Sequence, residues 1–169
     1  MKQLLLLAFV FLTIQPIFSQ NEKENTASTY YFIRHAEKDR SDLSNRNPHL
    51  IEIGKQRAEH WNNVLKNIEF DAVYSTEYHR TIETASPTAL KNNIEITFYD
   101  PSNIDNQEFL NSTKGKSVLV VGHSNTTPEF VNKLLGKEKY KHIDDSNNAN
   151  LYIVTIFKDT ISDTLLLVE

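Results

Sequence analysis

Two arginines and two histidines stand where stretches of apolar sequence end. Arg34 and His35 close the first stretch, Arg80 comes shortly after a second, and His123 follows a third with only Gly122 between. A guanidinium group binds phosphate oxygens through paired hydrogen bonds and stays charged at any working pH. A histidine whose ring nitrogen is unprotonated can attack phosphorus, and a second one can donate to the phosphate oxygens. Together, these residue types indicate phosphoryl transfer.

The apolar stretches have the composition of β-strands. Residues 29–33 are aromatic and β-branched, residues 70–74 form a second short run, and residues 117–121 are almost continuously apolar. A continuous apolar run is typical of a central parallel strand that is covered on both faces. In open α/β sheets, ligands bind beyond the carboxyl ends of the strands. If the three strands are parallel neighbours, the arginines and histidines that follow them converge on one site.

The rest of the chain alternates between helix-like and strand-like segments. Apolar residues recur at helical spacing over residues 51–67 and 75–90, and Pro87 is expected to bend or interrupt the second helix. The other expected elements are loops at 38–48 and 100–116 with a turn of helix at 107–111, a helix from Thr127-Pro128, and strands at 94–99, 151–157 and 161–168. This alternation predicts the α/β class: a three-layer αβα sandwich with a mainly parallel central sheet and a C-terminal hairpin.

The first twenty residues differ from the remainder. Lys2 is followed by an apolar run over residues 4–14, and Ser19 precedes a polar stretch. This order is typical of a secretory signal peptide, and the run is too short for a comfortable membrane span. We therefore expect a signal peptide at 1–20, a flexible lead-in at 21–28 and a single domain at 29–169, exported to the periplasm or secreted. An uncleaved N-terminal anchor is the alternative; after cleavage, no stable membrane insertion is expected.

The composition narrows the possible functions. The 169 residues carry a formal net charge of −4, which argues against a nucleic-acid partner because such proteins present a basic surface. A pocket for an anionic phosphate must then be basic locally. The chain has no cysteine, which excludes disulfides, thiolate catalysis and cysteine-ligated metal centres. Its length is enough for one domain with a proper core but not for two ordinary ones.

The same residues resemble the motifs of a known family. Residues 34–37, Arg-His-Ala-Glu after a strand, resemble the RHG-type signature of the histidine phosphatase superfamily, branch 1, which is phosphoglycerate-mutase-like. Residues 75–85 are similar to its second motif, S-x-x-x-x-R-T-x-x-T-A, and residues 121–125 to its third, a Gly-His pair after a core strand. Residues 50–58 resemble the opening of the connecting helix. In order and spacing, the chain is similar to a compact, SixA-like member.

The resemblance implies a phosphoglycerate-mutase-like fold and a role for each motif residue. His35 is the nucleophile that becomes phosphorylated, Arg34 and Arg80 bind the phosphate, and His123 completes the phosphate pocket as a hydrogen-bond donor. The implied activity is that of a metal-independent phosphatase for a small phosphorylated substrate, either a phosphomonoester or a phosphoramidate, with neither metal nor cofactor. Ala36 stands where the family usually has glycine, which requires a negative φ at that position.

Several alternatives stay open. The segment after the second motif offers Asp100, Asp105 and Glu108 as the general acid, and compact members similar to SixA lack a clear acid there. A phosphoglycerate-type phosphomutase would use the same four residues but needs a water-excluding lid, for which there is no long insertion. A non-catalytic phosphate-binding domain is a third possibility. A metal-dependent hydrolase would use His35, His123 and a carboxylate as metal ligands, but the sequence contains no closely spaced ligand pair that supports this alternative.

The remaining polar residues carry weaker predictions. Lys38 either extends the phosphate pocket or is solvated, and His79 is a neighbour of the site rather than a participant. Residues 144–148 lack the glycine and distal glutamate of a calcium loop and are expected as a polar loop near the site mouth. Three histidines without motif support are expected on the surface: His49, His60 and His142. Neither the substrate nor the oligomeric state follows from the sequence.

Overall fold

The structure is a computed structural model that describes residues 26–103 and 106–169. The expected signal peptide at 1–20, most of the lead-in and Asp105 lie outside the described residues. Within them, no helix is both long enough and apolar enough to span a membrane.

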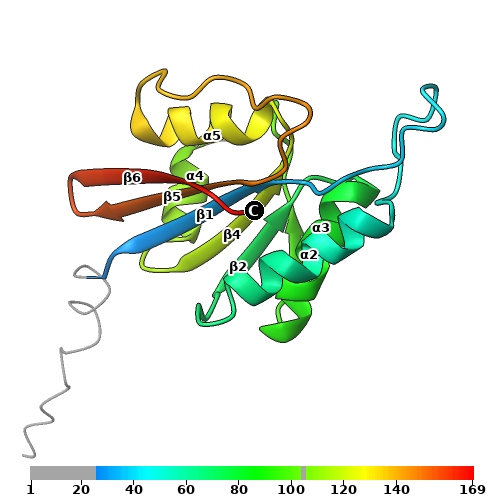
Figure 1. The fold of residues 1–169 in the computed structure, drawn as a ribbon. Coiled ribbons are helices and arrows are strands. Elements are labelled where there is room, and N and C mark those ends of the chain that lie inside the picture. The colour runs from blue at the N-terminus through cyan, green and yellow to red at the C-terminus, as the bar shows by residue number, and fades with distance from the viewer. Residues whose placement is uncertain (1–25, 104–105) are drawn as a thin grey trace, which may run out of the picture.

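Six strands form one mixed sheet in the order β3-β2-β4-β1-β5-β6 (Figure 1). The pairs β1–β4, β4–β2 and β2–β3 are parallel, whereas β5 is antiparallel to both β1 and β6. The strands are β1 Ser28–Arg34, β2 Ala72–Ser75, β3 Ile96–Phe98, β4 Ser117–Gly122, β5 Asn150–Phe157 and β6 Thr160–Leu167. The expected C-terminal hairpin is present, with Lys158 in the left-handed region at φ 53° in its turn.

The continuous apolar run of β4 lies in the middle of the parallel part of the sheet. Its residues 118–121 are all buried, and the strand pairs with β1 on one side and β2 on the other. Consecutive side chains of a strand point to opposite faces, so a strand that is apolar at every position must be covered on both. The expected central strand is therefore confirmed.

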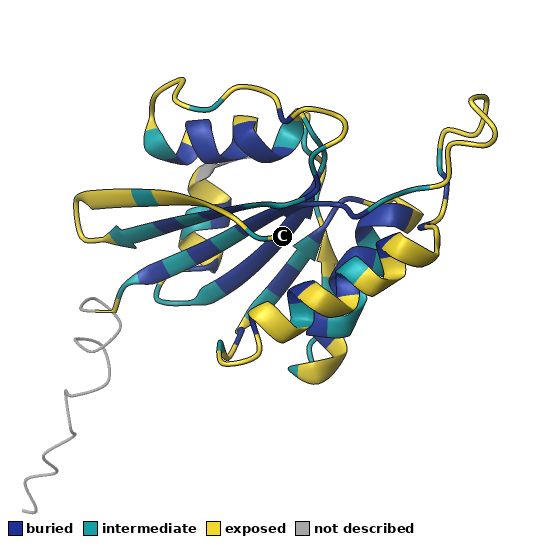
Figure 2. Cartoon of the chain, viewed as in Figure 1, coloured by how far each residue is buried: buried dark blue, intermediate teal, exposed yellow. Residues whose placement is uncertain are grey.

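Helices cover both faces of this sheet (Figures 1 and 2). On one face, α2 (Glu52–Val64) and α3 (His79–Lys91) bury Trp61 and Ala85 against Leu119 and Val121 of the sheet. On the other face, α4 (Asn106–Ser112) and α5 (Thr126–Leu135) contribute Phe109, Phe130 and Val131 to a second cluster. The expected three-layer αβα arrangement is thus confirmed.

Two helices differ from the expectation. The helix expected at residues 75–90 begins only at His79, because Thr76 and Tyr78 form a turn in which the Thr81 hydroxyl bonds to both of their carbonyl oxygens, at 2.8 and 2.9 Å. The expected interruption at Pro87 is wrong, since α3 continues to Lys91. Proline removes only one helical hydrogen bond, and the buried apolar face of α3 is continuous on both sides of Pro87.

Gly54 lets α2 approach the loop that leaves β1. A Cβ atom at this position would lie 2.1 Å from the carbonyl oxygen of Glu37, so only glycine fits. The backbone amide of Ile51 also donates to that carbonyl oxygen, at 3.0 Å. The start of α2 therefore fixes the backbone directly after the residues expected to carry the chemistry.

Candidate active site

The four residues predicted from the sequence come together at the carboxyl edge of three adjacent parallel strands. His35 follows β1, His123 follows β4, and Arg80 lies in the first turn of α3, after β2. The backbone amide of His35 donates to the Gly122 carbonyl at 2.9 Å, which joins the ends of β1 and β4. The ring centroids of His35 and His123 are 5.5 Å apart, and Arg80 Nη2 lies 3.5 Å from His123 Nδ1. The expected convergence is therefore observed.

His35 has the protonation pattern of a nucleophile. Its Nδ1 lies 2.7 Å from the carbonyl oxygen of Ala36, and since a carbonyl can only accept, Nδ1 carries the proton. Nε2 then has a free lone pair, and it has no hydrogen-bond partner among the described residues. Burial, reinforced by the charges of Arg34 and Arg80, lowers the pKa of His35 to about 3. The ring is therefore neutral at neutral pH.

Backbone contacts fix the position of this ring. Asn148 donates from Nδ2 to the His35 carbonyl oxygen at 2.7 Å, and the Ala36 amide donates to Thr84 Oγ1 at 2.9 Å. Only Asn93 and Lys158 have positive φ among the described non-glycine residues, so Ala36 has the backbone conformation that its side chain requires. Alanine in place of the family's usual glycine therefore introduces no strain.

His123 is held between a threonine and an arginine. A guanidinium group can only donate, so the 3.5 Å contact with Arg80 makes Nδ1 of His123 an acceptor. The ring proton is then on Nε2, which donates to Thr76 Oγ1 at 2.9 Å. Burial, followed by the charges of Arg80 and Lys38, lowers the pKa of His123 to about 4. In this state the ring is neutral and offers a lone pair, not a proton, toward Arg80.

Arg80 keeps part of its hydrogen-bonding capacity unused. Its guanidinium carbon lies 4.4 Å from the centroid of the Tyr78 ring, a cation–π contact that fixes the plane of the group. Nη1 reaches the Arg46 carbonyl only at 3.4 Å, and the buried Nε has no partner. Buried N–H groups without partners are rare in folded proteins. Arg80 is thus a positioned cation with donors available for an anion.

Arg34 is engaged differently from Arg80. Its buried guanidinium donates from Nη1 to the carbonyl oxygens of Asp144, Asp145 and Asn147, at 2.9–3.1 Å. Its Nη2 forms an ion pair with Asp145 Oδ1 at 2.6 Å. The structure therefore shows Arg34 organising the loop at residues 144–147, while its positive charge helps to lower the pKa of His35. Its Nε is buried without a partner.

A small cavity of about 210 Å³ opens beside His35. Larger hollows of about 830 and 660 Å³ lie elsewhere on the surface and contain none of the four motif residues. The cavity is lined by His35, Ala36, Glu37, Lys38, Arg40, Asp145, Ser146 and Asn148. Lys38 thus belongs to the pocket, and burial together with Arg80 and Arg40 lowers its pKa. With Arg34 and Arg80, whose charges also act on His35, the basic groups around the cavity outnumber its two carboxylates, Glu37 and Asp145. The surroundings are then basic, as a phosphate pocket in a chain of net negative charge requires.

Three residues of this cavity were not singled out from the sequence: Arg40, Asp145 and Asn148. Asp145 forms ion pairs of 2.6 Å with both Arg34 and Arg40, which hold the pKa of its carboxyl group at about 2. The sequence pattern that pointed to two of them was the polar run at residues 144–148. This run was expected near the site mouth, and that position is confirmed. What the run did not indicate is that one of its carboxylates binds two of the basic residues.

The candidate general acids do not line this cavity. Asp100 is exposed and accepts hydrogen bonds from Ser102, and Glu108 lies on α4 beside a separate hollow. Asp105 lies outside the described residues. The carboxylates that share the cavity with His35 are those of Glu37 and Asp145, and Arg57 pairs with Glu37 at 2.7 Å. Both carboxylates that line the cavity are thus paired with arginine side chains.

The neutral state of the two site histidines gives the fold a specific sensitivity to acid. An unfolded histidine titrates near pH 6.5, whereas His35 and His123 stay unprotonated in the folded protein down to pH of about 3 and 4. Between these values the unfolded chain binds protons that the folded one does not, so we expect the free energy of unfolding to fall as pH decreases from about 6.5 to about 4. Urea titrations across this range measure the slope.

His123→Gln should flatten that slope, because one depressed pKa is removed, whereas the exposed control His60→Gln should not change it. Equal slopes in all three proteins would show that His123 is not held neutral by the fold.

The comparisons with known proteins agree with this geometry. Residues 30–101 match the family model described as the histidine phosphatase superfamily (branch 1), a range that contains Arg34, His35 and Arg80. No curated protein matches the sequence.

Solved structures resemble the chain over most of its length. A protein described as the phosphohistidine phosphatase SixA of Agrobacterium tumefaciens is 20% identical, with a TM-score of 0.59 over 82% of this chain and 97% of that protein. A phosphoglycerate mutase from Bacillus anthracis is 15% identical, with a TM-score of 0.62 over 86% and 95% of the two chains. A protein described as an α-ribazole-5′-phosphate phosphatase of Escherichia coli is 14% identical, with a TM-score of 0.64 over 84% and 97%.

At these identities the likeness to the solved structures shows a shared fold. The resemblance seen in the sequence motifs is confirmed for residues 30–101, which match branch 1 of the histidine phosphatase superfamily, and the chain shares the fold of solved structures that include SixA-like proteins. His123, directly after β4, lies beyond the residues that the family model matches.

Proposed function

We propose that the protein is a metal-independent phosphatase that hydrolyses phosphomonoesters or phosphoramidates through a phosphohistidine on Nε2 of His35. The observation that carries this proposal is the state of the His35 ring. Nδ1 carries the ring proton and donates it in a hydrogen bond to the Ala36 carbonyl oxygen, so the lone pair is on Nε2. His35 lines a cavity that also contains the basic side chains of Lys38 and Arg40. That arrangement supports a nucleophile in a pocket for an anion.

The reaction follows in two displacements. Nε2 of His35 attacks phosphorus, the P–Nε2 bond forms, and the bond from phosphorus to the leaving oxygen or nitrogen breaks; the leaving atom keeps the electron pair and takes a proton from solvent. Water then attacks the phosphohistidine, and the P–Nε2 bond breaks with its electron pair returning to Nε2. One proton of the water stays on the released phosphate and the other returns to solvent. Arg80 and Lys38 neutralise the charge on the non-bridging oxygens, which is the main catalytic requirement of phosphoryl transfer.

His123 changes its role when an anion is bound. In the ligand-free state its Nδ1 accepts from Arg80. A phosphate oxygen that takes the Arg80 donor frees this nitrogen, and the negative charge favours its protonation. Nδ1 can then donate to the phosphate, while the Nε2–H bond to Thr76 keeps the ring in place. We therefore expect His123 to act as a hydrogen-bond donor only when phosphate is bound.

The carboxylates favour a substrate whose leaving group needs little protonation. Asp145 is held as an anion by two arginines, and Asp100 and Glu108 lie beside other hollows. A phosphoramidate such as phosphohistidine leaves with less help from a general acid than an alkyl phosphate does. One structural neighbour bears the name of a phosphohistidine phosphatase. We therefore place phosphoramidates first among the substrates to test.

A phosphomutase is the second candidate, because one structural neighbour is a phosphoglycerate mutase. The two activities differ in the fate of the phosphoryl group, which a mutase returns to the substrate and a phosphatase releases to water. We expect release, since the loop at residues 38–48, which lines the cavity through Lys38 and Arg40, is mostly exposed.

The experiment that tests the proposal uses the purified protein and a generic aryl phosphate without added metal. Turnover should persist in EDTA and be inhibited by vanadate. A panel of phosphohistidine peptide, sugar phosphates, nucleotides and phosphoglycerate then ranks substrates, with acid-labile phosphate trapped on His35 as the direct evidence of the intermediate. Loss of activity in EDTA would favour a metal-dependent hydrolase, and phosphate binding without any turnover would favour a non-catalytic domain.

We also propose that the protein works outside the cytoplasm, on the strength of the signal-peptide pattern in residues 1–20. Fractionation of expressing cells, with N-terminal sequencing of the recovered protein, checks both export and cleavage near residue 20. Retention of the intact N-terminus in the membrane fraction would support the uncleaved anchor instead.

Asp145→Asn should increase the affinity for inorganic phosphate by about fivefold, because the exposed ion pair of Asp145 with Arg40 contributes at most about 1 kcal/mol. The native carboxylate competes with phosphate for Arg40 and for the buried Arg34. The amide keeps the shape of the side chain and can still accept from Arg34. The product-inhibition constant measures the effect. Asp144→Asn is the matched control, since the Asp144 carboxylate bonds to Ser146 in the same loop. Weaker phosphate inhibition in Asp145→Asn alone would show that the carboxylate supports the pocket and does not compete.

A further inference from the structure

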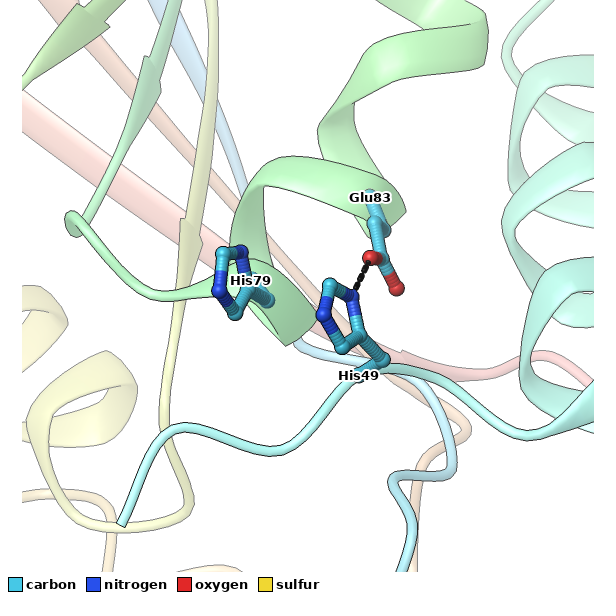
Figure 3. A group of neighbouring side chains, drawn as sticks. All are labelled: His49, His79 and Glu83. Carbon is cyan, nitrogen blue, oxygen red and sulfur yellow. Dashed lines mark hydrogen bonds and ion pairs between the residues drawn. The ribbon is translucent and has the colours of Figure 1, made fainter. Parts of the chain in front are cut away.

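A second group of chemically capable side chains lies outside the phosphate pocket. His49 is in the loop before α2, and His79 and Glu83 are on α3, four positions apart and therefore on the same face of the helix (Figure 3). His49 was expected only as a surface group and His79 as a neighbour of the site, and Glu83 carried no prediction of its own. The histidines are indeed exposed, but the fold brings all three side chains together.

The three side chains have the geometry of a ligand set. The two imidazole rings stack with centroids 4.0 Å apart and planes at 12°. Nδ1 of His49 forms a short ion-pair contact with Glu83 Oε1. One ligand atom from each residue can be chosen so that all three lie within 4.8 Å of one another. The lone pair of an imidazole nitrogen lies in the plane of its ring, so at least one of the stacked rings has to turn before both can bind one ion, and the exposure of both histidines allows that turn.

The donor set selects the class of ion. Two imidazole nitrogens and one carboxylate oxygen form a common three-ligand set for Zn²⁺, which binds them at about 2.0–2.2 Å and leaves a fourth tetrahedral position for water. Imidazole ligands favour zinc and related transition ions over Mg²⁺ and Ca²⁺, which prefer oxygen ligands alone. We propose that His49, His79 and Glu83 bind a zinc-like divalent cation with solvent in the fourth position.

The surroundings of the three residues support their orientation. The second carboxylate oxygen of Glu83 accepts the backbone amide of Leu50 at 2.8 Å, and the backbone amide of His79 donates to Asn47 Oδ1 at 2.8 Å. The bond from Leu50 holds the Glu83 carboxylate, as contacts around metal ligands do in functional sites, whereas the bond from His79 holds only its backbone. Both contacts dock the end of the loop on α3.

The position of the site gives the ion a structural consequence. His79 precedes Arg80, and Glu83 precedes Thr84, whose hydroxyl binds the Ala36 amide. An ion shared by His49 and α3 links the loop at residues 38–48 to the helix that carries the phosphate-binding arginine. The ion is not in the phosphate pocket, so it takes no part in the displacement at phosphorus. Ion binding and metal-independent turnover are then separate properties that can be tested separately.

The test is a calorimetric titration of Zn²⁺ into the full chain, purified without a histidine tag and stripped with EDTA. We expect one site per chain, a raised Tm with the ion bound, and a tetrahedral absorption spectrum when Co²⁺ replaces Zn²⁺. His49→Ala and His79→Ala should each weaken binding by at least about tenfold, and Glu83→Gln should do so while keeping the side chain's shape.

His142→Ala is the matched control, because His142 pairs with Glu129 at 2.8 Å on the surface without a second histidine. Its affinity for Zn²⁺ should equal that of the unchanged protein. The proposal is overturned if the unchanged protein does not bind Zn²⁺, if His79→Ala binds as tightly as the unchanged protein, or if His142→Ala removes the binding. None of these outcomes bears on the phosphatase assay, which is run in EDTA.

Discussion

Replacing His35 with alanine should lower kcat by about 10,000-fold or more and abolish the acid-labile phosphoenzyme. The reason is that Nε2 of His35 is the only protein atom in the proposed mechanism that forms a bond to phosphorus, and a lost nucleophile cannot be offset by the remaining pocket. Steady-state turnover of an aryl phosphate and rapid acid quenching with labelled substrate measure the two effects.

The fold should survive this replacement. The contacts that fix the backbone around His35 involve its carbonyl and amide groups, which bond to Asn148 and Gly122 and remain in the variant. His60→Ala, which removes an exposed histidine from α2, controls for the general effect of such a change. A His35→Ala protein that folds normally and keeps even a tenth of its turnover would exclude the covalent mechanism.

Replacing Arg80 with alanine should lower kcat/KM by about 1,000-fold and weaken inhibition by vanadate to a similar degree, because the charged donors it supplies are stronger in the transition state. The guanidinium group lies over the Tyr78 ring and has a buried Nε without a partner, which makes it the best-placed free donor in the described site. Arg80→Lys should recover part of the loss, since it restores the charge but not the paired hydrogen bonds.

The matched control for Arg80 is Lys141→Ala, which removes one exposed positive charge outside the pocket. If both alanine variants lose activity equally, the effect is one of overall charge rather than of a positioned donor. If Arg80→Lys is as impaired as Arg80→Ala, charge alone contributes nothing, and the paired geometry of the guanidinium group carries the whole effect.

The sequence predicted those parts of the molecule that depend on local pattern. The apolar run at residues 117–121 could belong only to a strand covered on both faces, and β4 is that strand. The position of His35 and His123 directly after their strands then determined their convergence, because the ends of parallel neighbours share one edge of the sheet. The helix-like turn expected at residues 107–111 is also present, within α4.

What the sequence did not predict depends on contacts between distant segments. The ion pairs of Asp145 with Arg34 and Arg40 join residues more than a hundred positions apart, and no periodicity encodes such a pairing. The same holds for the group formed by His49, His79 and Glu83, whose members come from a loop and a helix. The late start of α3 has a local cause, the Thr81 hydroxyl bonds, but propensity alone does not distinguish that turn from a first turn of helix.

The bonds from Arg34 to the loop at residues 144–147 also constrain when the site can exist. They close a contact across 111 positions of the chain, and Asn148 reaches back in the same way to the His35 carbonyl. Contacts of such high sequence separation form only after most of the chain has been made and has collapsed. A nascent or still-unfolded chain therefore has every motif residue up to His123 but no assembled pocket, so the proposed hydrolysis requires the folded chain.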